Sequence, residues 1–152
     1  MILPRANVLN SLKSAKFDWH PETVRRFCGD ENYYIPTEKD VVNEVVRYLA
    51  YMRESELSYQ LGRYDCNAFA LLVHGWATLQ AWKDDAARPP WPLGHMFAGF
   101  NMAEYKMTGH ALNVCLVRTA ENKLVWMWIE PQTGQVGPAE TCGWGHIWSV
   151  EI

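Results

Sequence analysis

The feature that most limits how this chain can fold is an apolar stretch that begins at Cys66 and runs to Trp82. When CNAFALLVHGWATLQAW is wound into a helix, almost no polar face remains. A helix that is apolar all round is typical of the centre of a domain, where neighbours cover every side. The sequence therefore predicts a buried central helix from Cys66 to about residues 83–85, where the charges Lys-Asp-Asp begin.

Before this helix, the sequence predicts one further helix and an irregular start. Residues 37–53 place apolar side chains at helical spacing, with Thr37 as N-cap and acidic residues in the first turn. Residues 1–35 contain turn signals and little periodicity, so we expect irregular structure there, with a short helix over residues 21–27. After the central helix, the prolines of ARPPWPLG predict a loop over about residues 86–108.

The last third of the chain has the alternation that is typical of β-strands. Residues 112–116 and 125–129 alternate around a turn at Glu121 and Asn122, which predicts a β-hairpin. Residues 145–152 show the same alternation and are expected to form a final strand. Helices followed by antiparallel strands predict an α+β domain, and the length of 152 residues suits a single domain spanning 1–152.

Composition excludes several functions. The net charge of −3 and a pI near 5.9 argue against nucleic acid as a ligand. A membrane-spanning helix needs a run of about 18 apolar residues, and the sequence contains no such run. The first residues also lack the apolar segment of a signal peptide. We therefore expect a cytoplasmic protein with free thiols. The four cysteines form no CxxC pair, so a zinc ribbon or finger is not expected. The residues themselves indicate no cofactor and no metal site.

Cys66 stands where a nucleophile would be stabilised. Asp65 can cap the helix, which places the thiol at the positive end of the helix dipole. A nucleophilic cysteine also needs a base, which is usually a histidine. If the hairpin turns at residues 121–122, facing residues have numbers that sum to about 241 to 243, so His110 lies opposite residues 131–133, within a residue or two of Glu130. A carboxylate beside an imidazole orients it, as in a catalytic triad.

Three motifs carry a resemblance to a known family. YDCNAFA, GHALNV and WIEPQTG, in this order, resemble the Cys, His and Glu motifs of a papain-like cysteine peptidase domain. The similarity is to the compact kind at the C-terminus of a fungal agglutinin and in related bacterial and phage proteins, and it covers about residues 35–137. It implies Cys66 as nucleophile, His110 as general base and Glu130 as orienting residue. Gln60 matches the position of an oxyanion-hole glutamine.

This resemblance implies a papain-like fold, with the buried helix that carries Cys66 packed on an antiparallel sheet. It also implies a thiol hydrolase, acting on a protein or peptide substrate or on another amide. The resemblance also implies calcium, because the agglutinin-type domains depend on it. A calcium site after the cysteine would need an acidic run, however, and Asn67 and Ala68 stand there instead.

A second function stays open. The papain signature around the nucleophile is absent, and His110 follows Cys66 by only 44 residues where papain needs about 130 to 150. The eight tryptophans could instead supply a partner surface, with Trp91 and Trp144 as candidates. The alternative to a cysteine hydrolase is therefore a non-catalytic binding module on the same fold.

Overall fold

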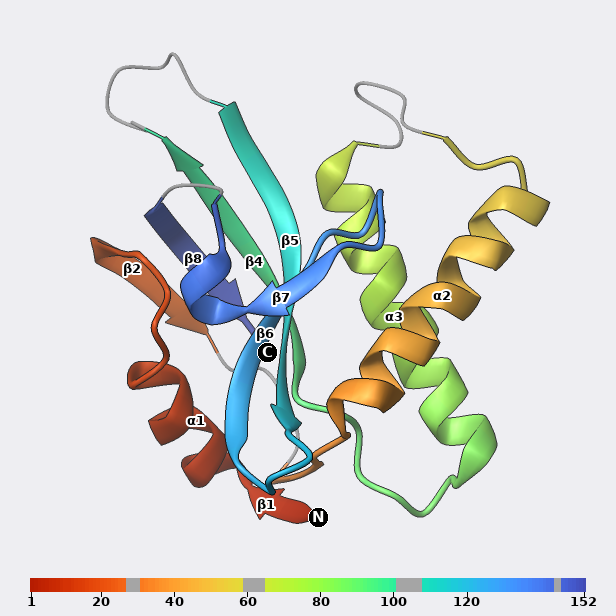
Figure 1. The fold of residues 1–152 in the computed structure, drawn as a ribbon, viewed down its shortest axis with the longest axis horizontal. Coiled ribbons are helices and arrows are strands. Elements are labelled where there is room, and N and C mark those ends of the chain that lie inside the picture. Colours follow the sequence, from red (N-terminus) through yellow and green to blue (C-terminus); the bar gives the residue numbers. More distant parts are fainter. Residues whose placement is uncertain (27–30, 59–64, 101–107, 144–145) are drawn as a thin grey trace.

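The computed structural model describes residues 1–26, 31–58, 65–100, 108–143 and 146–152 (Figure 1). In chain order the elements are β1 (Ile2–Pro4), α1 (Arg5–Lys13), β2 (Trp19–Arg26), β3 (Asn32–Tyr34), α2 (Glu38–Glu54), α3 (Cys66–Asp84), β4 (Leu93–Phe100), β5 (Thr108–Arg118), β6 (Leu124–Ile129), β7 (Val136–Pro138), a 3-10 turn (Ala139–Thr141) and β8 (His146–Glu151). Over these residues, no helix is long and apolar enough to cross a membrane.

The two long predicted helices are present, and both begin at the expected caps. The Thr37 hydroxyl accepts a hydrogen bond from the Asp40 amide at 3.2 Å, and the Asp40 carboxylate accepts one from the Thr37 amide at 2.8 Å. This reciprocal capping box fixes the start of α2. At α3 the Asp65 carboxylate accepts a hydrogen bond from the Ala68 amide at 3.1 Å. Local side-chain chemistry therefore sets both helix starts.

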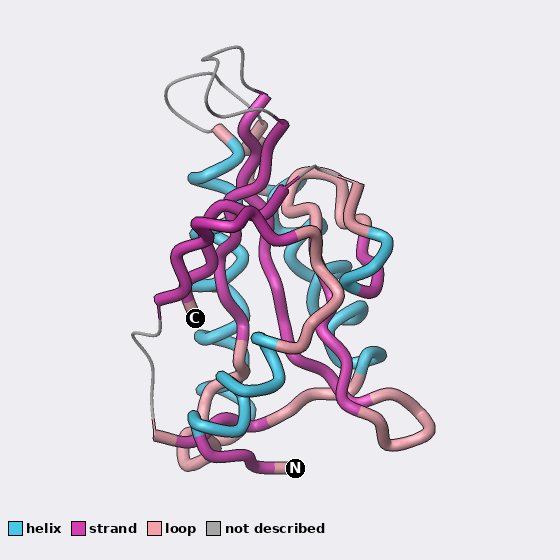
Figure 2. Tube along the Cα trace, turned by 90° about the vertical axis from the view of Figure 1, so that its left-hand side faces the viewer, coloured by secondary structure: helices cyan, strands magenta, loops and turns pink. Residues whose placement is uncertain are grey.

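The strands form a six-stranded sheet of order β2-β8-β4-β5-β6-β7, and β1 pairs with β3 separately. The β5–β6 hairpin has the predicted register, since Asn113 pairs with Ile129 and Arg118 with Leu124. The final strand, β8, is also confirmed. β2 lies parallel to β8, whereas every other pairing in this sheet is antiparallel among the described strands. Figure 2 shows the strands running along the length of the molecule in side view.

The sheet is covered on both faces, which gives three layers (Figure 1). On one face, α1 packs through Val8 and Leu12 onto the even-numbered residues of β5. On the other face, α2 and α3 pack onto Cys115 and Val117, together with residues of β4 and β6. Because side chains alternate along a strand, β5 contributes to both clusters and is buried on both faces.

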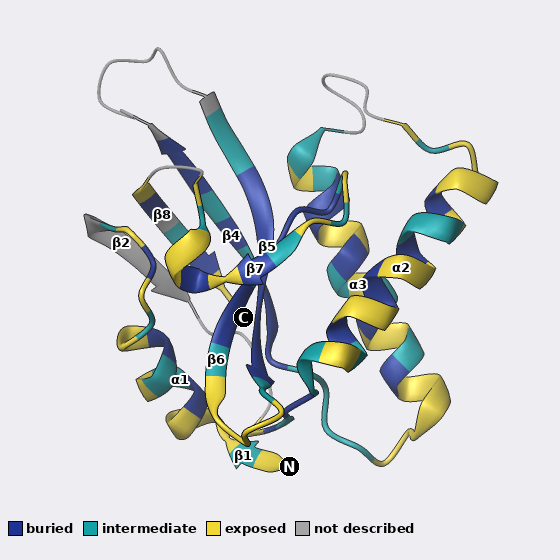
Figure 3. Cartoon of the chain, viewed as in Figure 1, coloured by how far each residue is buried: buried dark blue, intermediate teal, exposed yellow. Residues whose placement is uncertain are grey.

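The central helix is the first correction. One side of α3 packs against the sheet, but Leu71, Leu79 and Trp82 are 54%, 46% and 62% exposed. Figure 3 shows the exposed outer sides of α2 and α3. The helix is therefore part of an outer layer and is covered on one side within this chain. The expectation of a helix buried all round on an antiparallel sheet is wrong, because the sheet is mixed and the helix lies on its surface.

Two further regions also differ from expectation. Residues 19–26 form β2, where a short helix was expected over 21–27, and residues 2–13 form β1 and α1 rather than irregular structure. Residues 93–100 of the predicted loop form β4, which pairs with β5 on one side and β8 on the other. For β1, β2 and β4, partners distant in sequence supply the backbone hydrogen bonds that the local residues do not predict.

Candidate functional site

The N-terminus of α3 carries the predicted thiol. Cys66 is half-buried, is a free cysteine and follows the Asp65 cap directly. The next residue, Asn67, joins the helix to the sheet, because its Oδ1 lies 2.8 Å from the Nε2 of His95 on β4. The start of α3 is therefore fixed by its own cap and by a contact to the central part of the sheet.

The predicted pair of His110 and Glu130 is present. His110 Nε2 lies 2.5 Å from Glu130 Oε2, as the hairpin register implies. Glu130 is buried, and its second carboxylate oxygen accepts a hydrogen bond from the Gln132 amide at 3.1 Å. The turn after β6 fixes the backbone of Glu130, since the Gly134 amide donates to the Glu130 backbone carbonyl at 2.8 Å. The imidazole is thus oriented by a buried and hydrogen-bonded carboxylate.

Two of the four predicted residues are joined in the structure. The N-terminus of α3, which begins at Cys66, and the start of β5 lie toward the same end of the molecule (Figure 1). Within the described parts of the chain, however, the Cys66 thiol makes no hydrogen bond, either to His110 or to Glu130. Gln60 lies outside the described residues. The geometry therefore supplies an oriented imidazole and a half-buried thiol, and a contact between them remains a prediction from the sequence.

Asn113 is a structural residue that the sequence analysis missed. It is fully buried on β5, and its side-chain amide donates to the carbonyls of Ala70 at 2.8 Å and Gly94 at 3.1 Å. One amide therefore ties β5 to α3 and β4 at once. In GHALNVCLV, this polar residue stands within an apolar run, which was the available signal for a buried hydrogen-bonding role.

A large open groove lies between the outer sides of α2 and α3, and we call it the α2–α3 groove. Its volume is about 670 Å³, and it is lined by Tyr48, Tyr51, Ala68, Leu71, Leu72, Gly75, Trp76, Leu79, Gln80 and Lys83. The Tyr51 and Trp76 rings stack with centroids 4.9 Å apart. The apolar and aromatic wall is thus accompanied by one amide and one ammonium group.

Glu44 holds the indole of this groove in place. The Trp76 Nε1 donates to Glu44 Oε1 at 2.5 Å, and Glu44 is only 8% exposed. Its other oxygen lies 3.4 Å from the Arg47 guanidinium. A buried carboxylate is stable when it is paired and hydrogen-bonded, and here both conditions are met. The Trp76 ring is therefore oriented by a strong contact between α2 and α3.

The described residues contain no cluster of three His, Cys, Asp or Glu side chains placed to hold a metal ion.

Comparison with known proteins gives a family and a fold. The family model of the ricin-type beta-trefoil lectin C-terminal domain matches residues 10–146. No curated protein matches the sequence. Among solved structures, one described as the PSL1a-E64 complex is 18% identical, with a TM-score of 0.77, and the match covers 99% of this chain and 51% of that chain.

A second solved structure is the Polyporus squamosus lectin bound to the human-type influenza-binding epitope Neu5Aca2-6Galb1-4GlcNAc. It is 17% identical with a TM-score of 0.69, and the match covers 99% of this chain and 49% of that one. The chain thus spans about half the length of the structures it matches. At these identities the likeness concerns the fold.

These comparisons correct the resemblance drawn from the sequence. The matching family is a lectin domain, so the assignments to papain-like peptidases and to a papain-like fold are wrong. The family match therefore contradicts the expected cysteine hydrolase and its peptide substrate. Roles for Cys66, His110, Glu130 and Gln60 remain predictions from the sequence.

Proposed function

Since the chain belongs to the ricin-type beta-trefoil lectin C-terminal domain family, we propose that it is a binding module whose ligand is a carbohydrate. The observation that carries the proposal is the α2–α3 groove, with its stacked Tyr51 and Trp76 rings open to solvent. Tyr51 is 42% exposed, so an aromatic face is available to a ligand. The family match and the groove support the same class of function independently.

The chemistry of the groove suits a sugar. A pyranose ring has an apolar face of C–H groups and a rim of hydroxyls, so it needs an aromatic surface together with a few hydrogen-bonding groups. Here, Tyr51 and Leu71 supply apolar surface, while Gln80 and Lys83 supply an amide and an ammonium group. The volume of about 670 Å³ is sufficient for more than one sugar ring.

The rigidity of the groove also favours binding. Trp76 cannot turn freely, because its Nε1 is bonded to the buried Glu44 and its ring contacts both Tyr48 and Tyr51. A surface that is ordered before the ligand arrives loses less conformational entropy when the ligand binds. We therefore place the sugar on the Tyr51 side of the groove, with Trp76 as its fixed support.

Binding to a panel of oligosaccharides tests this proposal. The panel includes the sialylated trisaccharide named for the Polyporus squamosus lectin, and affinity is measured by calorimetry. Tyr51→Ala removes the exposed stacking ring and is expected to weaken binding about tenfold. Trp82→Ala is the matched control, since Trp82 is an exposed aromatic of α3 that does not line the groove.

Cys66→Ala separates binding from turnover. A binding module keeps its full affinity for the sugar in this variant, because the thiol does not line the groove. Failure of every oligosaccharide to bind the wild type would refute the proposal. Turnover of an amide substrate that disappears in Cys66→Ala would refute it as well, because that result would assign chemistry to the thiol.

A further inference from the structure

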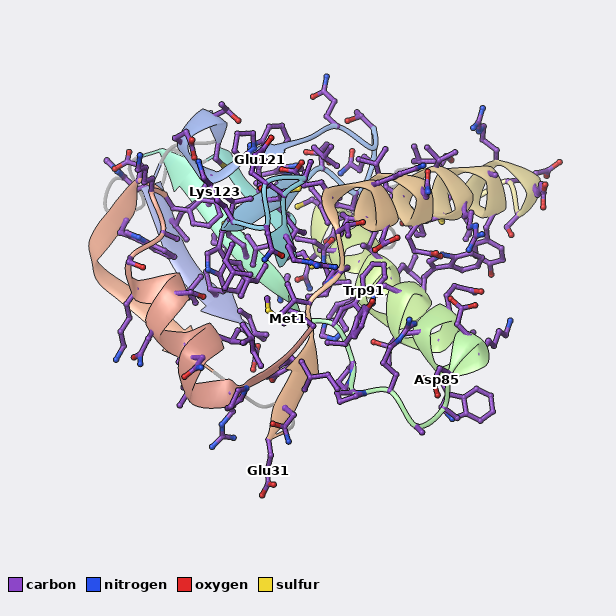
Figure 4. All side chains as sticks on the ribbon, turned by 60° about the horizontal axis from the view of Figure 1, so that its bottom comes forward. Met1, Glu31, Asp85, Trp91, Glu121 and Lys123 are labelled. Carbon is purple, nitrogen blue, oxygen red and sulfur yellow. The ribbon has the colours of Figure 1, made fainter. Side chains whose placement is uncertain are left out.

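A separate groove lies between the C-terminal end of α2, the first turn of α3 and the turn after β6, and we call it the α2–turn groove. Its volume is about 670 Å³, and it is lined by Leu49, Met52, Arg53, Leu57, Ser58, Phe69, Pro131, Gln132 and Thr133. None of these described residues lines the α2–α3 groove. Trp91, labelled in Figure 4, lies beside the first half of α2, so this groove is at the opposite end of that helix.

The two walls of the α2–turn groove are fixed to each other. The Gly134 amide donates to the Glu130 carbonyl at 2.8 Å, which closes the turn. Gly134 packs so closely on α2 that an added Cβ would lie 2.3 Å from a Leu49 methyl. Met52 from α2 and Phe69 from α3 are buried in the same core cluster. A ligand would therefore meet a surface that is ordered in advance, which lowers the entropy cost of binding.

Arg53 is the charged member of the described lining. Its Nε donates to the Leu49 carbonyl at 3.3 Å, and its Nη atoms keep their N–H donors for another acceptor. The ion pairs found in the described parts of the chain do not include Arg53. The neighbouring Glu54 and Glu56 are exposed and do not line the groove. Because a guanidinium stays protonated, the α2–turn groove carries a positive charge near neutral pH.

We propose that the α2–turn groove binds a small organic carboxylate with an aliphatic body. The planar guanidinium of Arg53 matches a carboxylate through two parallel hydrogen bonds, and the Gln132 amide offers a further donor. Met52, Leu57 and Phe69 supply apolar surface for the body, and covering this surface adds to the affinity. The site does not depend on the proposed sugar groove, because the two share no described lining residue.

Three small ligands test the proposal. Hexanoate is titrated into the full chain at about pH 7.5, where it is ionised. Hexanol is the neutral analogue, and acetate keeps the charge but lacks the aliphatic body. NMR follows the methyl groups of Met52 and Leu57 in this groove, and those of Leu71 and Leu79 in the α2–α3 groove. We expect hexanoate to shift the first pair, and hexanol and acetate to bind about tenfold more weakly.

Substitutions of the cation locate the site. Arg53→Gln should weaken hexanoate binding about tenfold, and Arg53→Lys, which keeps the charge but loses the planar fork, should give an intermediate affinity. Lys83→Gln is the matched control, because it removes the cation that lines the α2–α3 groove and should leave the hexanoate affinity unchanged. Thermal unfolding of each variant shows whether the fold is kept.

Several results would overturn the proposal. If Arg53 serves only the end of α2, Arg53→Gln changes the melting temperature and leaves the hexanoate affinity as it was. Equal affinities for hexanoate and hexanol would show that the charge is not recognised. Methyl shifts confined to Leu71 and Leu79, or no binding of hexanoate at all, would also exclude a carboxylate site in the α2–turn groove.

Discussion

Replacing Asn113 by aspartate should destabilise the fold in a pH-dependent way. The change keeps the shape of the side chain but removes both N–H donors. The Asn113 amide nitrogen lies 2.8 Å from the Ala70 carbonyl oxygen and 3.1 Å from the Gly94 carbonyl oxygen, and the residue is fully buried. In Asn113→Asp, the new carboxylate would therefore face two carbonyl oxygens without a cation. α3, β4 and β5 would lose their shared contact.

The size of the effect follows from the two carbonyls. Each buried acceptor that loses its donor costs about 1–3 kcal/mol, so the loss is about 2–6 kcal/mol once the carboxyl group is ionised. This is a large share of the 5–15 kcal/mol that is typical of whole domains. Burial without a cation disfavours the charged form of the new carboxyl group, so its pKa in the folded state rises above the ordinary value of about 3.9. While the group is protonated, the destabilisation is smaller.

The raised pKa sets the sign of the pH dependence. Between the two pKa values the folded state binds more protons than the unfolded state, so the free energy of unfolding of the variant decreases as the pH rises. Urea unfolding of wild type and Asn113→Asp at about pH 4.5 and about pH 8 measures this difference. Asn43→Asp, at an exposed position of α2, is the control. A variant as stable as wild type at about pH 8 would refute the role assigned to the Asn113 amide.

Three further predictions concern other contacts. Gly134 has a φ of +76°, and an added Cβ would lie 2.3 Å from a Leu49 methyl, so Gly134→Ala should lower the free energy of unfolding by about 2–4 kcal/mol in urea titrations. Gly143→Ala, which meets no atom within 4 Å, should cost much less, and equal losses would contradict this. Trp76→Phe leaves the buried Glu44 carboxylate without its indole donor and should cost about 1.5–3 kcal/mol by the same assay, whereas Glu44→Gln keeps an acceptor and should cost less. Burial lowers the pKa values of His74 and His95 below the ordinary value, which means that the unfolded state binds more protons in mild acid, so stability should fall as the pH drops below about 6.5. His74→Gln should flatten this dependence in thermal unfolding, and an unchanged profile would show that His74 does not contribute.

The parts of the fold that the sequence predicted are those fixed by neighbouring residues. The cap of α2 needs only Thr37 and Asp40, which are three residues apart. The contact of His110 with Glu130 spans 20 residues, but the β5–β6 turn brings the two residues to within two positions of facing each other, since antiparallel partners keep a constant sum of residue numbers. The stretch 93–100 became a strand because β5 and β8 flank it, and nothing within its own Pro-rich neighbourhood indicates those partners.

The sequence does not predict the α2–α3 groove, and the reason is related. Tyr51 and Trp76 belong to different helices, so their stacking depends on how α2 packs against α3 and not on any spacing within one motif. The apolar pattern of α3 was interpreted as burial on all sides, because the hydrophobic effect favours covering every such residue. The pattern, however, does not specify what covers each side. The sheet covers Phe69 and Val73, whereas Leu71 and Leu79 line the groove at the surface. A ligand-binding surface requires apolar side chains that the core leaves exposed and that lie beside an oriented aromatic ring. The same failure of the burial prediction therefore marks where a ligand should be sought.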